Sequence, residues 1–296
     1  MLTPYSNIKT KEDIIEQLET NKEFVYSICD NVVYIMKSCI DVDEENYLVL
    51  DANQATVLGL FNKQYRLFCH FIECHKADKI EICLILQRIV YEAFLKMQYL
   101  INNGEVAQKQ YRVYSYRNRW EVYEHTNNME ITLGYFNVRN SKFLLDLEEE
   151  GLSIDEIKSS NKPFPSMSKL IEELEEYDAK GKGNNSIFYK SLFGIPSDSI
   201  HSDWGEIRQL YLEKGPVPNK YFVDIDKVNK GHYRYLASFT DILIKSTLNY
   251  IGWLESYGYA LDTLKSILLE LERMVILIMK YVFDEYNAEN SKYMYE

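Results

Sequence analysis

The strongest constraint on the fold is a long series of apolar residues between Asp78 and Gly104. Its members recur every three or four positions: Ile82, Ile85, Leu86, Ile89, Val90, Ala93, Phe94, Met97 and Leu100. This spacing places them on one face of an α-helix, whereas a half-buried strand would alternate at every second residue. Asp78, with Glu81 three residues later, is a candidate N-cap, and Gly104 is a candidate terminator. The series therefore predicts a central core helix that begins at Asp78 and ends at Gly104.

Similar spacing recurs along most of the chain. It predicts further helices over residues 10–40, 47–76, 105–124, 141–150, 168–177, 231–257 and 261–286. Only 12 Gly and 6 Pro interrupt the 296 residues, and no period of a solenoid repeat is visible. We therefore expect an all-α, multi-helix bundle with long central helices, in which more than about 60% of the residues are helical.

We expect these helices to form one domain over residues 1–296. Within it, residues 1–45 are a candidate N-terminal helical segment, residues 46–257 the core and residues 258–290 a C-terminal helix. Apolar surface between Met274 and Phe283 exceeds what one neighbouring helix should cover, so we expect a homodimer.

Charge, cysteine content and apolar runs limit the functions and cellular locations that we expect. The net charge of −12 works against non-specific binding to nucleic acid, so RNA could bind only through a local basic cleft. Five Cys without regular spacing fit reduced thiols and the cytoplasm. The start of the chain has no secretion signal, and the apolar run Met274–Met279 is too short to span a bilayer. We therefore expect a cytoplasmic protein without membrane contact.

Several familiar catalytic motifs are missing from the sequence. There is no GxxxxGK[ST] phosphate loop, no GxSxG nucleophile elbow and no complete dinucleotide-binding glycine motif. None of the five His has a Glu three positions upstream, as di-iron helical bundles require. We therefore expect no cofactor.

The densest group of metal-ligand types lies between Cys69 and His75. It comprises Cys69, His70, Glu73, Cys74 and His75. His70 and Cys74 would share one helix face, but a single helix does not easily supply a tetrahedral ligand set, and no second motif completes it. We therefore expect structural cysteines and surface histidines here, and no metal.

Arg119 and His125 have the spacing seen in helical HEPN-type ribonucleases. In those enzymes the Arg binds phosphate and the His handles the proton of the attacking 2′-hydroxyl. Trp120 departs from that pattern, because a polar residue usually follows the Arg. The pair is therefore a candidate catalytic site, with a purely structural role as the alternative.

Arg88 and Glu92 interrupt the apolar central helix at i, i+4 spacing. A cation in a core helix needs an acceptor or a polar cleft, because burying it unpaired is costly. The pair is either a structural ion pair or part of such a cleft.

His201 is the best single candidate for chemistry, because it titrates near neutrality and stands close to Tyr189, Asp203 and Trp204. The alternative is that His201 and Asp203 cap a helix over residues 204–212. We predict that Arg88, Glu92, Tyr189 and His201 meet in one polar cleft.

The segments ILQRIVYEAFLKMQYLI, AQKQYRVYSYRNRW and IFYKSLFGIPSDSIHSDW together resemble a bacterial family, domain-of-unknown-function family 5677. The family pattern falls here on Arg88, Glu92, Tyr111, Tyr114, Tyr189, His201 and Ser202. The resemblance covers about residues 50–257, and the chain departs from it at Ile195–Asp198. It implies an all-helical, HEPN-like domain without an established activity, and some members resemble components of bacterial anti-phage systems.

Two functions therefore compete, and whether the protein is an enzyme stays open. One is a ribonuclease-type effector that uses Arg88 or Arg119 with a His. A basic pocket would favour it, formed by Arg88, Arg112, Arg117, Arg119 and His201. The other is a non-catalytic interaction protein that docks a partner through a surface rich in its 25 Tyr.

Overall fold

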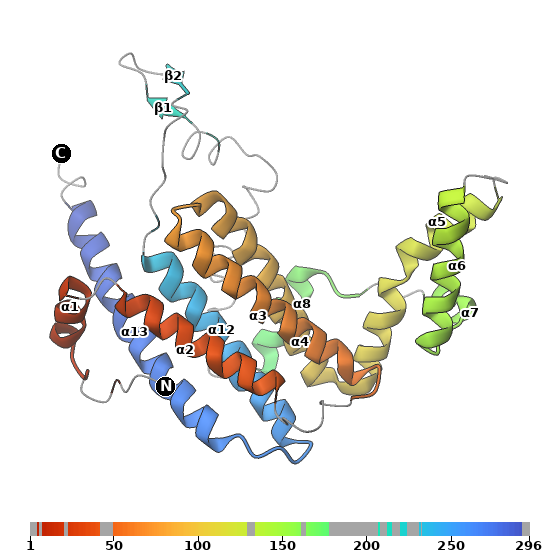
Figure 1. Cartoon of the computed structure of the whole chain (residues 1–296), viewed down its shortest axis with the longest axis horizontal. Coiled ribbons are helices and arrows are strands. Elements are labelled where there is room, and N and C mark those ends of the chain that lie inside the picture. Colours follow the sequence, from red (N-terminus) through yellow and green to blue (C-terminus); the bar gives the residue numbers. More distant parts are fainter. Residues whose placement is uncertain are drawn as a thin grey trace.

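The computed structural model describes residues 5, 8–20, 23–41, 50–128, 134–160, 164–177, 207, 212–214, 220–223, 231 and 233–291. Of these residues, 83% are helical, which confirms the predicted all-α class. Figure 1 shows the helices as a bundle from which one group of helices projects. Among the described residues, no helix combines the length and apolar character needed to cross a membrane.

The elements follow one another along the chain as helices with one short hairpin. They are α1 (Lys11–Thr20), α2 (Phe24–Ile40), α3 (Gln54–Lys76), α4 (Ile80–Ser115), α5 (Arg117–Asn128), α6 (Gly134–Glu149), α7 (Ile154–Ser159), α8 (Met167–Tyr177), β1 (Glu213–Lys214), β2 (Tyr221–Phe222), α12 (Tyr233–Glu255) and α13 (Asp262–Ser291). β1 and β2 pair antiparallel, with Glu213 opposite Phe222.

α12 occupies the centre of the bundle and contacts α2, α3, α4 and α13. Most of its side chains are buried, including polar ones whose hydrogen bonds are satisfied locally. The hydroxyl of Thr240 donates to the Leu236 carbonyl at 2.7 Å. Ser246 Oγ donates to Gln64 Oε1 on α3 at 2.6 Å. These bonds let a helix with polar residues lie inside an apolar core.

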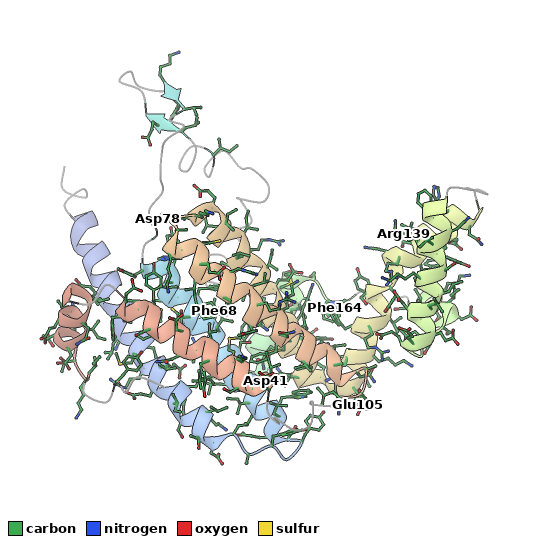
Figure 2. The ribbon with its side chains drawn as sticks, in the orientation of Figure 1. Asp41, Phe68, Asp78, Glu105, Arg139 and Phe164 are labelled. Atoms are coloured by element: carbon green, nitrogen blue, oxygen red, sulfur yellow. The ribbon has the colours of Figure 1, made fainter. Side chains whose placement is uncertain are left out.

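Aromatic rings join α12 to α3. Phe61 stacks on Tyr250 with ring centroids 3.9 Å apart. Further along α3, the rings of Phe68 and Phe71 contact the ring of Phe239, with centroids 5.7 and 4.3 Å away. Figure 2 shows Phe68 inside the bundle. The apolar periodicity of α3 therefore predicted the face that contacts α12.

The predicted helix over residues 10–40 is two helices, α1 and α2, so that prediction was wrong in its continuity. Its start was right: Thr10 Oγ1 accepts from the Asp13 amide at 3.2 Å, and Asp13 Oδ2 accepts from the Thr10 amide at 2.8 Å. The start of the next helix was placed too early. Asp51 Oδ1 accepts from the Gln54 amide at 2.9 Å, and α3 begins there.

The predicted start of the central helix was wrong. Asp78 has a left-handed backbone, with φ of 54°, and its carboxylate accepts from the Gly231 amide at 2.9 Å instead of capping α4. The predicted end at Gly104 was right, because its backbone is not helical, with φ of 62° and ψ of −157°. Two helical segments meet there at a kink, and together they form α4.

The part of α4 after Gly104 projects from the bundle together with α5, α6 and α7 (Figure 1). We call residues 105–160 the arm. It has a small apolar core of its own, formed by Val113, Phe143, Leu147, Leu152 and Ile157. α6 begins at Gly134, earlier than predicted. α7 was not predicted, although Ser153 and Glu156 form a capping box at its start.

The Phe61–Tyr250 stack yields the first testable prediction. Phe61→Ala should lower the free energy of unfolding by about 3–5 kcal/mol, because it leaves a cavity in the core. Tyr250→Phe should leave it unchanged or raise it by up to about 1 kcal/mol, because the buried hydroxyl has no hydrogen-bond partner among the described residues. Urea unfolding measures both. A loss above about 1 kcal/mol in Tyr250→Phe would contradict this account of the hydroxyl.

Candidate functional site

A row of charges lies on the bundle half of α4. Arg88 Nη1 is 3.5 Å from Glu92 Oε2, and Lys96 Nζ is 2.5 Å from Glu92 Oε1. The three side chains are half-buried, with 21–29% of their surface exposed. The ion pair expected from the spacing of Arg88 and Glu92 is therefore present, and Lys96 extends it by one turn.

The other half of the predicted cleft lies outside the described residues. This applies to Tyr189 and His201, and also to Asp203 and Trp204. The meeting of His201 with Arg88 therefore stays a prediction.

Arg119 and His125 both lie on α5, but in different settings. Arg119 Nη2 donates to Asp146 Oδ2 on α6 at 2.5 Å. Its guanidinium lies 5.2 and 5.6 Å from the ring centroids of Tyr116 and Phe143, within cation–π range. His125 is exposed. This geometry gives Arg119 a structural task, the attachment of α5 to α6.

Arg112 is the most buried of these arginines, at 9% exposure. Its Nε and Nη2 donate to Glu150 Oε2 at 2.9 and 2.7 Å, and Nη1 donates to Asn53 Oδ1 at 2.8 Å. It therefore ties the arm to the start of α3. Sequence reasoning missed Asn53 as a partner, because its position relative to Arg112 depends on the kink at Gly104. It missed Glu150 because the packing of the arm brings this residue to Arg112.

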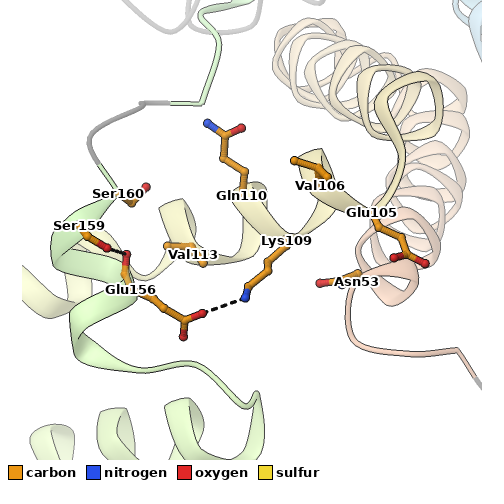
Figure 3. Close-up of a pocket in the computed structure, with 9 residues that line it drawn as sticks. All are labelled: Asn53, Glu105, Val106, Lys109, Gln110, Val113, Glu156, Ser159 and Ser160. Carbon is orange, nitrogen blue, oxygen red and sulfur yellow. Dashed lines mark hydrogen bonds and ion pairs between the residues drawn. The ribbon is translucent and has the colours of Figure 1, made fainter.

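Two cavities flank the root of the arm. The larger has a volume of about 730 Å³ and is lined by Asn53, Glu105, Val106, Lys109, Gln110, Val113, Glu156, Ser159 and Ser160 (Figure 3). The smaller, of about 340 Å³, is lined by Ala52, Ala55, Thr56, Tyr111, Arg112, Ser115, Tyr116, Arg119 and Glu150. Of the residues in the basic-pocket hypothesis, Arg112 and Arg119 share a cavity, Arg88 and Arg117 do not line it, and His201 lies outside the described residues.

Opposite charges are paired in both cavities. In the larger one, Lys109 Nζ lies 2.8 Å from Glu156 Oε1 (Figure 3). The hydrogen bonds from Lys109 and from the Ser153 amide lower the pKa of Glu156 to about 2. In the smaller one, Glu150 neutralises Arg112. A ligand phosphate would therefore have to displace a carboxylate.

The Cys69–His75 segment lies on α3 and divides between two environments. His70 is exposed and lies 3.3 Å from Glu73. His75 is buried, so the prediction of a surface histidine was wrong there. Its Nδ1 is 2.9 Å from the Tyr26 hydroxyl. No group of three metal-ligating side chains occurs in the described part of the chain.

Exposed large side chains are distributed unevenly. The exposed tyrosines of the described residues, Tyr34, Tyr114 and Tyr257, lie on α2, on α4 and after α12. The exposed aliphatic side chains lie partly on the arm, at Val106, Val138, Leu144 and Leu145, and partly elsewhere, at Ile82, Val223, Leu269 and Ile276. Three of them, Val138, Leu144 and Leu145, lie on α6, which makes this helix the candidate surface for a partner.

A matched pair of substitutions tests the anchoring role of Arg112. Arg112→Ala should lower the free energy of unfolding by roughly 2 kcal/mol, because it leaves Glu150 and Asn53 without their buried donor. Arg117→Ala should change it by less than about 0.5 kcal/mol, because Arg117 and Glu121 form an exposed pair. Equal effects of the two substitutions in urea unfolding would contradict the assignment.

Comparison with known proteins identifies one family. No curated protein and no solved structure matches the chain. Residues 54–217 match the family DUF5677, whose description is "family of unknown function". The match covers more than half of the chain and includes the arm and the Arg88–Glu92 pair, but it ends before α12. The chain therefore belongs to DUF5677, a family of unknown function.

Proposed function

We propose that the protein is a non-catalytic interaction protein that docks a protein partner through the outward face of α6. The observation that carries this proposal is a pair of exposed aliphatic side chains on that face. Val138 is 71% exposed and Leu145 57%. Seven residues separate them, so they lie on one side of the helix, two turns apart.

The opposite face of α6 packs against the rest of the arm. Phe143 and Leu147 are buried in the core of the arm, at 2% and 3% exposure. The helix is therefore fixed in position while two aliphatic side chains on its outward face remain exposed. A partner helix with an apolar stripe could bury that face without a rearrangement of the arm.

The pairing of the arginines supports this proposal over phosphate binding. Carboxylates lie within 3.5 Å of Arg88, Arg112, Arg117 and Arg119. An RNA backbone would have to compete with each of these carboxylates in a chain of net charge −12.

A second copy of the chain is the partner that α6 suits best. Its N-terminal half carries Arg139 and Lys142, and its C-terminal half carries Glu148 and Glu149. Two copies of α6 that pack antiparallel would bring the basic half of each against the acidic half of the other. Such a contact is isologous, as the interface of a two-fold homodimer must be.

Static light scattering on designed variants tests this proposal. The wild type should have a dimer mass at micromolar concentration, and Val138→Asp with Leu145→Asp should weaken association at least about tenfold per substitution. Leu269→Asp with Ile276→Asp is the matched control, since these exposed residues have the same spacing on α13. A monomeric wild type, or dissociation only in the control, would contradict the proposal.

The second candidate is a HEPN-like, ribonuclease-type effector of anti-phage defence. The observation that favours it is the half-buried charge row at Arg88, Glu92 and Lys96, which lies in the family-matched segment. If it is correct, the wild type should cleave RNA and arrest growth, and His201→Ala should abolish both while the melting temperature stays unchanged. Gel analysis of RNA incubated with both proteins measures this. Intact RNA in the wild-type reaction would exclude this candidate.

A further inference from the structure

The bend in α4 depends on the backbone of one residue. Gly104 has φ of 62° and ψ of −157°, a conformation that residues with a Cβ rarely adopt. A Cβ at this position would have no neighbour within 4 Å. The requirement for glycine is therefore a requirement of the backbone alone, and not of space.

Two contacts exist only because α4 is bent. Gln108 Nε2 donates to the Leu100 carbonyl at 3.3 Å, although these residues would lie roughly 12 Å apart along a straight helix. The Phe164 ring makes edge contacts with Tyr99 and Tyr111, at 5.4 and 5.1 Å. Figure 2 shows Phe164 between the bundle and the arm. A single ring could not touch both tyrosines along a straight helix.

The bent form also carries a cost. Gln108 is buried, at 1% exposure, and its Oε1 has no hydrogen-bond partner among the described residues. A buried carbonyl oxygen without a donor loses its hydration without compensation. The bend thus balances a few favourable contacts against one unsatisfied buried group.

We propose that Gly104 is a hinge about which the arm moves between this bent form and a straighter α4. The arm's bond to α3, from Arg112 Nη1 to Asn53 Oδ1, then acts as a latch of the bent form. The larger cavity lies at the hinge: Asn53 of the bundle forms one wall, while Val106, Lys109 and Glu156 of the arm form another (Figure 3). Movement of the arm therefore opens and closes this cavity. This proposal does not depend on the function of α6.

Small-angle X-ray scattering on glycine variants tests the hinge. Alanine cannot easily hold the backbone of Gly104, so Gly104→Ala should straighten α4 and increase the radius of gyration. Gly59→Ala and Gly252→Ala are matched controls, because both glycines lie within helices and a Cβ at either would have no neighbour within 4 Å. Their scattering should equal that of the wild type. A Gly104→Ala curve that superimposes on the wild type would overturn the proposal.

A second measurement covers the case in which Gly104→Ala does not fold. Spin labels at Ser141→Cys on the arm and Ser266→Cys on α13 report the distance between arm and bundle, after Cys69 and Cys74 are replaced by Ser. The proposal expects two distances, with Asn53→Ala shifting the population away from the bent form. A single narrow distance that Asn53→Ala leaves unchanged would overturn it.

Discussion

The burial of α12 is the constraint on which the rest of the structure depends. The helix is surrounded by α2, α3, α4 and α13, so each of these must present an apolar face to it. Several polar groups on α12 bond within the core, as Ser246 does to Gln64, whereas the Tyr250 hydroxyl has no partner among the described residues. Once α3 and α4 are fixed against α12, the kink at Gly104 and the bond from Arg112 to Asn53 set the direction in which α4 leaves the bundle.

The arm must be held by charge as well as by its own small core. Arg112 and Arg119 are each bonded to one carboxylate, and Arg112 is nearly buried while Arg119 is part-exposed. Their pairing with Glu150 and Asp146 joins α4, α5 and α6. This explains a cluster of arginines in an acidic protein without a phosphate ligand, and it leaves the outward face of α6 free for a protein partner.

The sequence predicted helices from the spacing of neighbouring apolar residues. It failed where a residue's role depends on contacts with residues distant in the chain. The periodicity of α3, α12 and α13 set their type and apolar faces, and the Thr10 cap followed from two neighbouring residues. Asp78 looked like a cap, but the Gly231 amide, distant in sequence, binds its carboxylate. Gly104 does interrupt the helix as predicted, but the direction of the segment that follows depends on contacts of Phe164 and Gln108 that the sequence does not show.

The contacts of the candidate site residues were likewise predictable in part. The i, i+4 pairing of Arg88 and Glu92 follows from helix geometry and was predictable. The partners of Arg112 and Arg119 were not, since they come from segments distant in sequence: Asn53 before α3, Asp146 on α6 and Glu150 after it. Met274 and Ile278, which suggested an exposed apolar face on α13, are buried in the bundle instead. Exposed aliphatic pairs remain at Leu269 and Ile276 on α13 and at Val138 and Leu145 on α6, and the pair on α6 is the more exposed.

Amide hydrogen exchange at two protein concentrations tests the central claim most directly, because it locates the interface within the chain. If α6 docks a second copy, residues 134–149 should exchange more slowly as the concentration rises through the dissociation constant. The exposed face of α13 around Leu269 should exchange at the same rate throughout. Protection that depends on concentration at α13 and not at α6, or at neither helix, would contradict the account.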